Sequence, residues 1–435
     1  MGKKKRNKNR TIETRQETAQ AGPLAALDAS KRRALAIAAC AALFIIGAML
    51  RMTDMDVKYR SPDEIVITYQ ARAIAERGLQ GIDFLIKEHK AQPSIWIYPS
   101  PVRIGHLLPL AAFMKVTGRT DEKMGAYMSM ALSIATLALV AALGLRFLNA
   151  PITLFALAFL AVSPMDLAIA RRTWQDSVLG FLCVGMIYCI AAISKNARAF
   201  FWYIVFVILG SWSILIKESG GVVYGLCGMW LIGALAAKKE YAKAVLVIAL
   251  GAVGTLIGIG FLAYLSHGVA PFLEVLRDHM GAIARNEYAI EYQSCSWFRF
   301  IKGFWILSPL GATFCATGIV VTFFVGKRYP LLYGLVFFTV TLVIITMKTP
   351  YCMNYRYVSA MFAPFCLLAG TALWYCAAFV KDKLKGAASL AVIACLMLVV
   401  VIAAAVDYSA FQKMFVRTHV KDISIKIVED VSALP

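Results

Sequence analysis

Long apolar runs, separated by short polar segments, dominate the pattern of this chain. An apolar run of about 18 residues or more is long enough to cross a bilayer as a helix. Eleven runs approach this pattern, although the third is short. They lie near 34–50, 125–145, 152–162, 178–193, 201–216, 220–236, 244–264, 310–325, 331–347, 358–380 and 387–406. The pattern predicts an all-α, polytopic membrane protein with about eleven transmembrane helices.

Composition supports the same class of protein. Of the 435 residues, 60% are hydrophobic and 16% are charged, whereas charged residues make up about a quarter of a typical soluble domain. The formal net charge is +20, and such a basic balance also raises the question of nucleic acid. No basic stripe interleaves with exposed aromatic residues, so nucleic-acid binding is not expected. We instead expect the positive charge to follow membrane orientation and contact with membrane lipids.

The positions of Lys and Arg predict that orientation, because these residues concentrate in cytoplasmic loops. With the basic N-terminus inside, eleven spans place most remaining positive charge on the same side, at 146, 195–198, 238–243, 327–328 and 381–385. The long segments 52–123, 265–308 and 407–435 fall on the other side. The sequence therefore predicts N-in, C-out topology, with the first span acting as a signal anchor.

This topology divides the chain into three parts. Residues 1–33 are expected to form a basic, disordered cytoplasmic tail, and residues 407–435 a short extracytoplasmic tail. Residues 34–406 form the transmembrane module. Its outer loops are predicted at 52–123, 163–177, 265–308 and 348–357. Only two of the ten cysteines, Cys295 and Cys352, fall in outer segments, which leaves a disulfide between them open.

The first outer loop carries two adjacent acids, Asp63 and Glu64, directly after Pro62. Proline suits the first turn of a helix, and negative charge is favoured there by the helix dipole. The pair is therefore either an acidic helix start or two carboxylates displayed at a membrane surface as general base or ligand. The apolar positions that follow suit an amphipathic helix on the membrane, and a second short helix follows it.

Two further residues of this loop allow two interpretations each. Tyr98 lies in an aromatic, proline-rich segment and fits either a membrane-interface anchor or a pocket residue. His106 lies on the apolar second helix. For His106 a packed, hydrogen-bonded side chain is favoured over a catalytic one.

Polar residues at the other outer boundaries also allow two interpretations. Arg172 and Asp176 fit a solvated loop that holds lipid headgroups, or a carboxylate aimed at the Asp63 site. Lys217 fits a structural ion pair or a phosphate-binding lysine. Arg356 fits a snorkelling side chain or a bidentate phosphate ligand.

The order of these motifs resembles that of the GT-C glycosyltransferases, especially the protein O-mannosyltransferases and the lipid A aminoarabinose transferases. The resemblance covers roughly residues 34–380. It is carried by Pro62-Asp63-Glu64, Tyr98-Pro99-Ser100-Pro101, Ala170-Arg171-Arg172 followed by Asp176, Lys217-Glu218-Ser219 and Arg356-Tyr357.

The resemblance implies transfer of a sugar from a polyprenyl-phosphate donor to a lipid, glycan or protein acceptor, with inversion. The reaction would take place on the extracytoplasmic face of a bacterial inner membrane. Asp63 would deprotonate or position the acceptor, and Glu64 would assist. The other roles implied are an acceptor or donor pocket of Asp176, Arg172, Tyr98 and His106, and a donor-phosphate site of Lys217, Arg356, Tyr357 and Arg103. An oxocarbenium-like transition state and a leaving phosphate stabilised by fixed cations fit these roles.

No cofactor is firmly implied and no metal ligands are predicted, while a divalent cation is left open. Two alternatives remain from the sequence. One is a transporter or flippase of a lipid-linked anion, although its polar residues would be expected near the bilayer midplane. The other is a catalytically inactive scaffold of the same fold.

Overall fold

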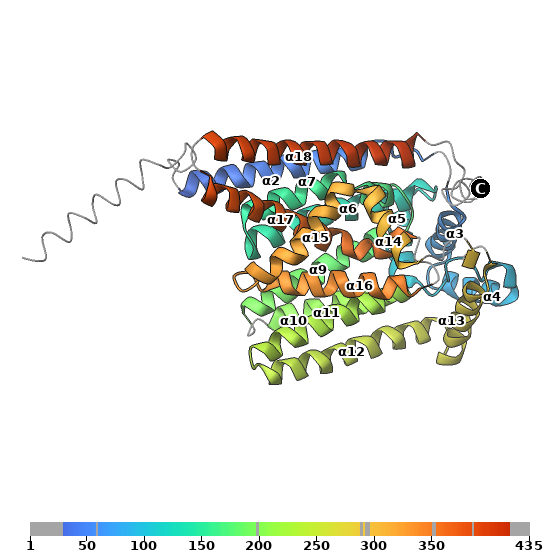
Figure 1. Cartoon of the computed structure of the whole chain (residues 1–435). Helices are drawn as coiled ribbons and strands as arrows, with labels where there is room; N and C mark the ends of the chain where they lie inside the picture. The colour runs from blue at the N-terminus through green and yellow to red at the C-terminus, as the bar shows by residue number, and fades with distance from the viewer. Residues whose placement is uncertain are drawn as a thin grey trace, which may run out of the picture.

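The protein is described by a computed structural model that covers residues 29–57, 60–196, 200–287, 290–291, 296–349, 354–384 and 387–417. Within these ranges the regular secondary structure is helical and no strand occurs (Figure 1). The all-α fold expected from the sequence is confirmed. Cys295 and Cys352, whose pairing was left open, lie outside the described residues.

Eleven helices correspond to the eleven predicted spans. They are α2 (Ala29–Met52), α6 (Lys123–Phe147), α7 (Ala150–Val162), α9 (Asp176–Lys195), α10 (Phe200–Ile216), α11 (Glu218–Ala237), α12 (Tyr241–Leu265), α15 (Pro309–Val325), α16 (Leu331–Met347), α17 (Phe362–Lys383) and α18 (Ala387–Phe411). Seven spans in the described part are long and apolar enough to cross a membrane, or up to eight if α15 and the helix before it form one bent span. The helices α7, α10 and α16 are shorter, so a total of eleven remains a prediction.

The remaining helices are short, and most of them belong to the predicted outer loops. They are α3 (Pro62–Arg77), α4 (Gln80–Ala91), η1 (Pro93–Ile95), α5 (Ile104–Thr117), α8 (Pro164–Ile169), α13 (Val269–Ala284), α14 (Trp297–Leu307), η3 (Tyr355–Met361) and the π-helical turn η4 (Gln412–Val416). Figure 1 shows α3, α4 and α13 together at one end of the bundle. The first outer loop therefore holds an additional helix, α4, between the two that the sequence predicts.

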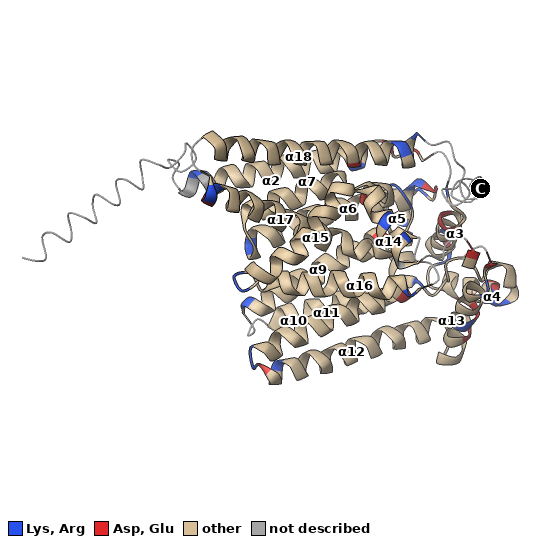
Figure 2. Cartoon of the chain, in the orientation of Figure 1, with Lys and Arg blue, Asp and Glu red and all other residues tan. Residues whose placement is uncertain are grey.

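Charge is distributed unevenly between the two ends of the bundle. Figure 2 shows Lys and Arg at the end where α2 begins, whereas most acidic residues lie at the opposite end with α3, α4 and α13. This is the distribution that underlies the predicted N-in orientation. The orientation itself remains a prediction.

The C-terminal helix extends beyond its predicted end at residue 406. α18 continues to Phe411, and Asp407 is buried within the bundle at 2% exposure. Its Oδ2 atom accepts a hydrogen bond of 2.6 Å from the Ser308 hydroxyl. The sequence places this acid in the outer tail because a charge usually ends an apolar run, but here a hydroxyl from a distant loop bonds to one of its oxygens. The other oxygen, Oδ1, is buried and has no hydrogen-bond partner among the described residues.

The centre of the bundle is α17, which packs closely against α7 and α15. Buried leucines and alanines on α17 form part of the main core cluster. The α15 helix approaches α17 at Gly318, where a Cβ atom would lie 2.0 Å from the carbonyl oxygen of Leu368. Small residues at such crossings let two helix backbones come close together.

We predict that Gly318→Ala destabilises the protein, because the added methyl group forces α15 away from the α17 backbone. The expected loss is about 1–3 kcal/mol, as for other overpacked cores, measured as a lowered midpoint of thermal unfolding in detergent. Gly228→Ala on α11 is the matched control, since its Cβ would meet nothing within 4 Å. It should be neutral or raise stability by up to about 1 kcal/mol. Equal midpoints for the two variants would contradict the packing described.

Candidate functional site

The first turn of α3 is held by Glu64, which is fully buried. Its Oε2 atom accepts the Ser61 backbone N–H at 2.8 Å and the Ser61 hydroxyl at 3.2 Å. A glutamate three residues after a serine cap is a common way to satisfy the free N–H groups of a helix start. The sequence pattern therefore fixes this side chain on its own helix.

The same carboxylate joins α3 to the second outer loop. Oε1 accepts hydrogen bonds from the Arg60 guanidinium and the Thr173 backbone N–H, both at 3.0 Å. Oε2 accepts a further one from Arg172 at 2.9 Å. Burial alone raises the pKa of Glu64, but Arg172, Arg60 and the backbone N–H groups outweigh burial and lower this pKa below its usual value. The Glu64 carboxylate is thus ionised and engaged by five protein donors.

Asp63, the neighbouring acid, has a different environment. Its Oδ2 atom accepts a hydrogen bond of 2.6 Å from Nη2 of Arg356, which is 293 residues away in sequence. The Asp63 side chain is 28% exposed and that of Arg356 is 15% exposed. Nε of Arg356 is buried and has no hydrogen-bond partner among the described residues. Of the three predicted acids Asp63, Glu64 and Asp176, only Asp63 faces solvent to this extent.

Asp176 and Lys217 form a second buried pair. Nζ of Lys217 donates to Oδ1 of Asp176 at 2.5 Å, and the two side chains are 6% and 4% exposed. The ring of Tyr357 lies 4.8 Å from Nζ of Lys217 and 5.4 Å from the Arg356 guanidinium. The second loop, the α10–α11 junction and η3 therefore converge on one place, as the sequence predicts.

Arg103 organises the other side of the site. Its guanidinium donates to Glu218 at 2.8 Å and to Gln175 at 3.2 Å. It also lies 3.0 Å from Nε2 of His279 on α13, whose Nδ1 is 2.8 Å from the Trp96 carbonyl oxygen. These contacts fit a neutral His279 with its proton on Nδ1. Burial, with Arg103 alongside, lowers the pKa of His279 to about 4.

The two remaining candidates of the first loop do not join these ion pairs. His106 is completely buried on α5, and neither ring nitrogen has a hydrogen-bond partner among the described residues. It is packed, as the sequence favours, but it lacks the hydrogen bond expected with that packing. Tyr98 is half-buried in the turn that follows η1.

Below the site, two arginines are buried at the boundary of the bundle. Arg51, at the end of α2, is fully buried and pairs with Asp166 on α8. It also donates to the Ser133 hydroxyl at 2.6 Å and to the backbone carbonyls of Gly47, Leu160 and Ala161. Arg171 donates to carbonyl groups at the same end of α2. Such complete pairing is what a charge requires inside an apolar bundle.

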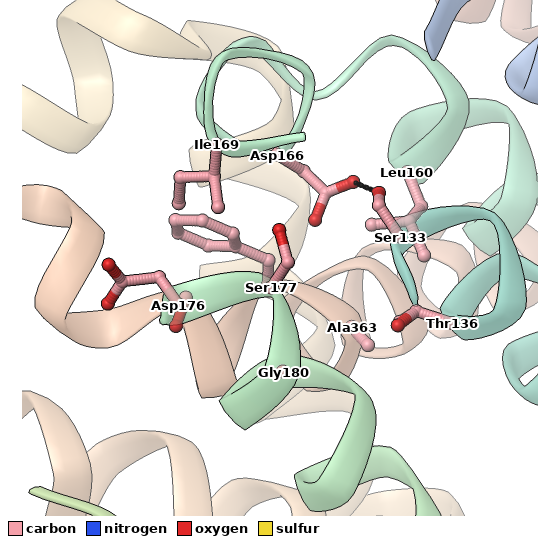
Figure 3. Close-up of a pocket in the computed structure, with 11 residues that line it drawn as sticks. Ser133, Thr136, Leu160, Asp166, Ile169, Asp176, Ser177, Gly180 and Ala363 are labelled. Carbon is pink, nitrogen blue, oxygen red and sulfur yellow. Dashed lines mark hydrogen bonds between the residues drawn. The ribbon is translucent and has the colours of Figure 1, made fainter. Parts of the chain in front are cut away.

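A small polar cavity separates Asp166 from Asp176 (Figure 3). It measures about 10 Å³, which is room for about one water molecule. The hydroxyl oxygens of Ser177 and Ser359 line it and have no hydrogen-bond partner among the described residues. In Figure 3, Ser177 points toward Asp166, which is bonded to Ser133.

Several residues of the site were not singled out from the sequence. Trp174 lies within 5.4 Å of the guanidinium groups of both Arg172 and Arg356. Its position in the predicted second-loop motif was a signal, but only the charged members of that motif were selected. Arg60 lies four residues before Glu64, so the spacing could have shown this ion pair. Gln175 and His279 both contact Arg103, which comes from a distant loop, and no local pattern links them to it.

A metal site does not emerge from the described residues, in which no group of three or more His, Cys, Asp and Glu is placed to hold a metal ion. Asp63 and Asp176 are each bonded to a cationic side chain. The dependence on a divalent cation that was left open from the sequence stays untested.

The fold is similar to that of GT-C glycosyltransferases of known structure. The fold that the order of the sequence motifs implied is therefore confirmed. The chain is similar to ArnT from Cupriavidus metallidurans bound to undecaprenyl phosphate. Identity is 14%, the TM-score is 0.52, and 93% of this chain and 79% of ArnT are covered. It is also similar to the oligosaccharyltransferase of Archaeoglobus fulgidus in the apo form, with 10% identity and a TM-score of 0.58. That match covers 87% of this chain but 55% of the oligosaccharyltransferase, so the chain spans about half of that protein.

A scan against protein-family models gave no match. A search of curated proteins gave none either. The structural likenesses, all well below a quarter in sequence identity, establish the fold alone.

We predict that Glu64→Gln lowers the free energy of unfolding by about 3–5 kcal/mol, the cost of removing one member of a buried ion pair. Arg60 and Arg172 would be left without their shared carboxylate. Thermal unfolding in detergent measures the loss. Glu88→Gln on α4 is the control, because the Tyr69 hydroxyl, in an exposed contact, is the one donor to the Glu88 carboxylate among the described residues. If the unfolding midpoint of Glu64→Gln were as high as that of the control, Glu64 would not hold α3 and the second loop together as described.

His279 should make stability depend on pH. Because the pKa is lower in the folded protein than the value of about 6.5 expected when unfolded, its contribution is present above pH 6.5 and is lost as pH falls toward 4. The loss approaches about 1.4 kcal/mol per pH unit.

The measurement compares unfolding midpoints of wild type and His279→Gln between pH 7.5 and about 4.5. The wild type should lose stability more steeply with acidification than the variant. His267→Gln, which replaces an exposed histidine, should keep the wild-type slope. Parallel curves for wild type and His279→Gln would exclude the expected titration.

Proposed function

We propose that this protein is a membrane glycosyltransferase that moves a sugar from a polyprenyl-phosphate donor to an acceptor on the extracytoplasmic face. The observation that carries the proposal is the ion pair of Asp63 with Arg356, set within a GT-C fold. It places a partly exposed carboxylate next to a cation able to bind phosphate. Transfer of a glycosyl group to a hydroxyl requires a base for the hydroxyl proton and a group that stabilises the leaving phosphate.

Asp63 would act on the acceptor. Its partial exposure lets an acceptor hydroxyl reach the carboxylate. Glu64, in contrast, is buried and already accepts hydrogen bonds from protein donors. We therefore assign Asp63 as general base and Glu64 as a residue that positions it by fixing the start of α3. The acceptor oxygen would bond to the anomeric carbon while its proton passes to Asp63.

Arg356 and Lys217, with Tyr357 between them, would act on the donor. The bond from the anomeric carbon to the donor phosphate breaks as the acceptor bond forms, and the lipid phosphate leaves with the bonding electrons. A single displacement of this kind inverts the anomeric carbon. Because Arg356 and Lys217 are paired with Asp63 and Asp176, an incoming phosphate would compete for both cations.

The substrate class rests on the structural relatives. ArnT was solved bound to undecaprenyl phosphate, and the oligosaccharyltransferase was also solved tethered to an acceptor peptide. These support a polyprenyl-linked donor and a lipid, glycan or protein acceptor for this chain. We propose a bacterial inner membrane as its location, with the α3, α4 and α13 end facing outward.

The test is transfer of radiolabelled sugar from polyprenyl-phosphate donors to total membrane acceptors by the purified protein. We predict that Asp63→Asn lowers the rate by about two orders of magnitude or more, the contribution of one general base. Folding and donor binding should be retained, because asparagine has nearly the same size and the Asp63 side chain is partly exposed, unlike that of Glu64.

Asp83→Asn on the neighbouring α4 is the matched control. Asp83 is 30% exposed and also pairs with a cation, Lys87, at 2.7 Å. It should transfer sugar at the wild-type rate. Equal rates for wild type and Asp63→Asn would remove Asp63 as base. Movement of donor lipid across proteoliposomes without transfer would instead indicate a flippase, and neither activity would indicate an inactive scaffold.

A further inference from the structure

Trp174 lies where the two acid–arginine pairs of the site meet. The Arg356 guanidinium is 4.8 Å from the centre of its ring and that of Arg172 is 5.4 Å away. Arg356 pairs with Asp63, and Arg172 pairs with Glu64. One indole therefore contacts the cationic partner of each of two adjacent carboxylates.

The indole is itself fixed in place. Its Nε1–H donates to the Ser61 hydroxyl at 3.2 Å, and that hydroxyl donates to Glu64. On the backbone, the Trp174 carbonyl accepts a hydrogen bond from Ser129 on α6, and the N–H of Thr173 donates to Glu64. Trp174 is therefore tied to the start of α3 and to the second turn of α6.

The contact with Arg356 has a clear physical purpose. An arginine side chain has many rotamers, and holding its guanidinium in one plane costs entropy. The negative face of an indole attracts a guanidinium and restricts its position. Arg356 has one hydrogen bond to Asp63, and its buried Nε has no partner among the described residues. Besides Asp63, the rings of Trp174 and Tyr357 lie against the guanidinium and help to orient it.

We propose that Trp174 is a positioning residue that holds the Arg356 guanidinium against Asp63. The cation that would bind the phosphate and the carboxylate that would accept the proton then keep fixed positions relative to each other. The role rests on the proposed transferase function. Trp174 acts through Arg356 and does not touch the reacting atoms. A different role, stacking of the indole on the donor sugar, would make its contribution independent of Arg356.

The first experiment measures kcat and KM for Trp174→Leu and Trp174→Phe. Leucine removes the aromatic face, and we expect kcat to fall on the order of 10- to 100-fold, as for misplaced catalytic groups, with little change in the acceptor KM. Phenylalanine keeps an aromatic face but loses the N–H, so its loss should be smaller. Trp202→Phe is the control, since Trp202 is also half-buried among aromatic rings but lies on α10, away from the site.

The second experiment asks whether Trp174 acts through Arg356. The Arg356→Lys variant has no planar guanidinium for the indole to orient. In that background Trp174→Leu should therefore lower kcat much less than it does in the wild-type background. Multiplicative losses from the two changes would overturn the proposal and favour sugar stacking. Wild-type kinetics for Trp174→Leu would overturn it as well.

A binding measurement separates this proposal from the proposed function. If the wild type transfers no sugar, affinity for undecaprenyl phosphate replaces kcat as the readout. Trp174→Leu should then weaken binding in the wild type, and by less in Arg356→Lys, and equal effects in both backgrounds would overturn positioning. If Trp174→Leu does not fold, the same comparison with Trp174→Phe gives the answer.

Discussion

Pairing of charge within an apolar bundle is the constraint on which the end of this protein that carries α3, α4 and α13 depends. A buried arginine or lysine is costly unless a carboxylate or carbonyl group meets it. Here the four acids Asp63, Glu64, Asp166 and Asp176 each bind a cation from another segment of the chain. These contacts fix the loops as well as neutralising charge. Their loss would release the loops together with the charges.

The same constraint gives the neighbouring acids Asp63 and Glu64 different roles. Glu64 is saturated by donors and serves the architecture, whereas Asp63 has a single ionic partner and remains in contact with solvent. Under the proposed function, an anionic donor would meet cations that already have partners, so its binding would exchange one ion pair for another. Each exchange would leave one carboxylate without its cation, and the partial exposure of Asp63 lets solvent stabilise that charge.

The sequence predicts the helices well, since apolar periodicity and helix-start chemistry are local properties. The acids at the start of α3, Arg172 and Arg356 were singled out from the sequence, but which acid pairs with which cation was not predicted. Asp63 and Arg356 are 293 residues apart, and Lys217 and Asp176 are 41 apart, so only the folded chain shows that they pair. Trp174 was missed for a related reason. An aromatic residue in a loop gains a role only from the cations that fold brings to it.

The buried pair of Arg51 and Asp166 bears on how the protein is made. The two residues are separated by 115 positions, so Arg51 leaves the ribosome long before its carboxylate exists. In the predicted orientation Arg51 must also cross the bilayer as the outer end of the first span. Until α8 emerges, its charge has no carboxylate partner and can be stabilised by water, by headgroups at the membrane surface and by the polar groups of α2, α6 and α7 that it contacts in the folded protein. The ion pair that fixes the outer end of the first helix can therefore form only after α8 has been synthesised.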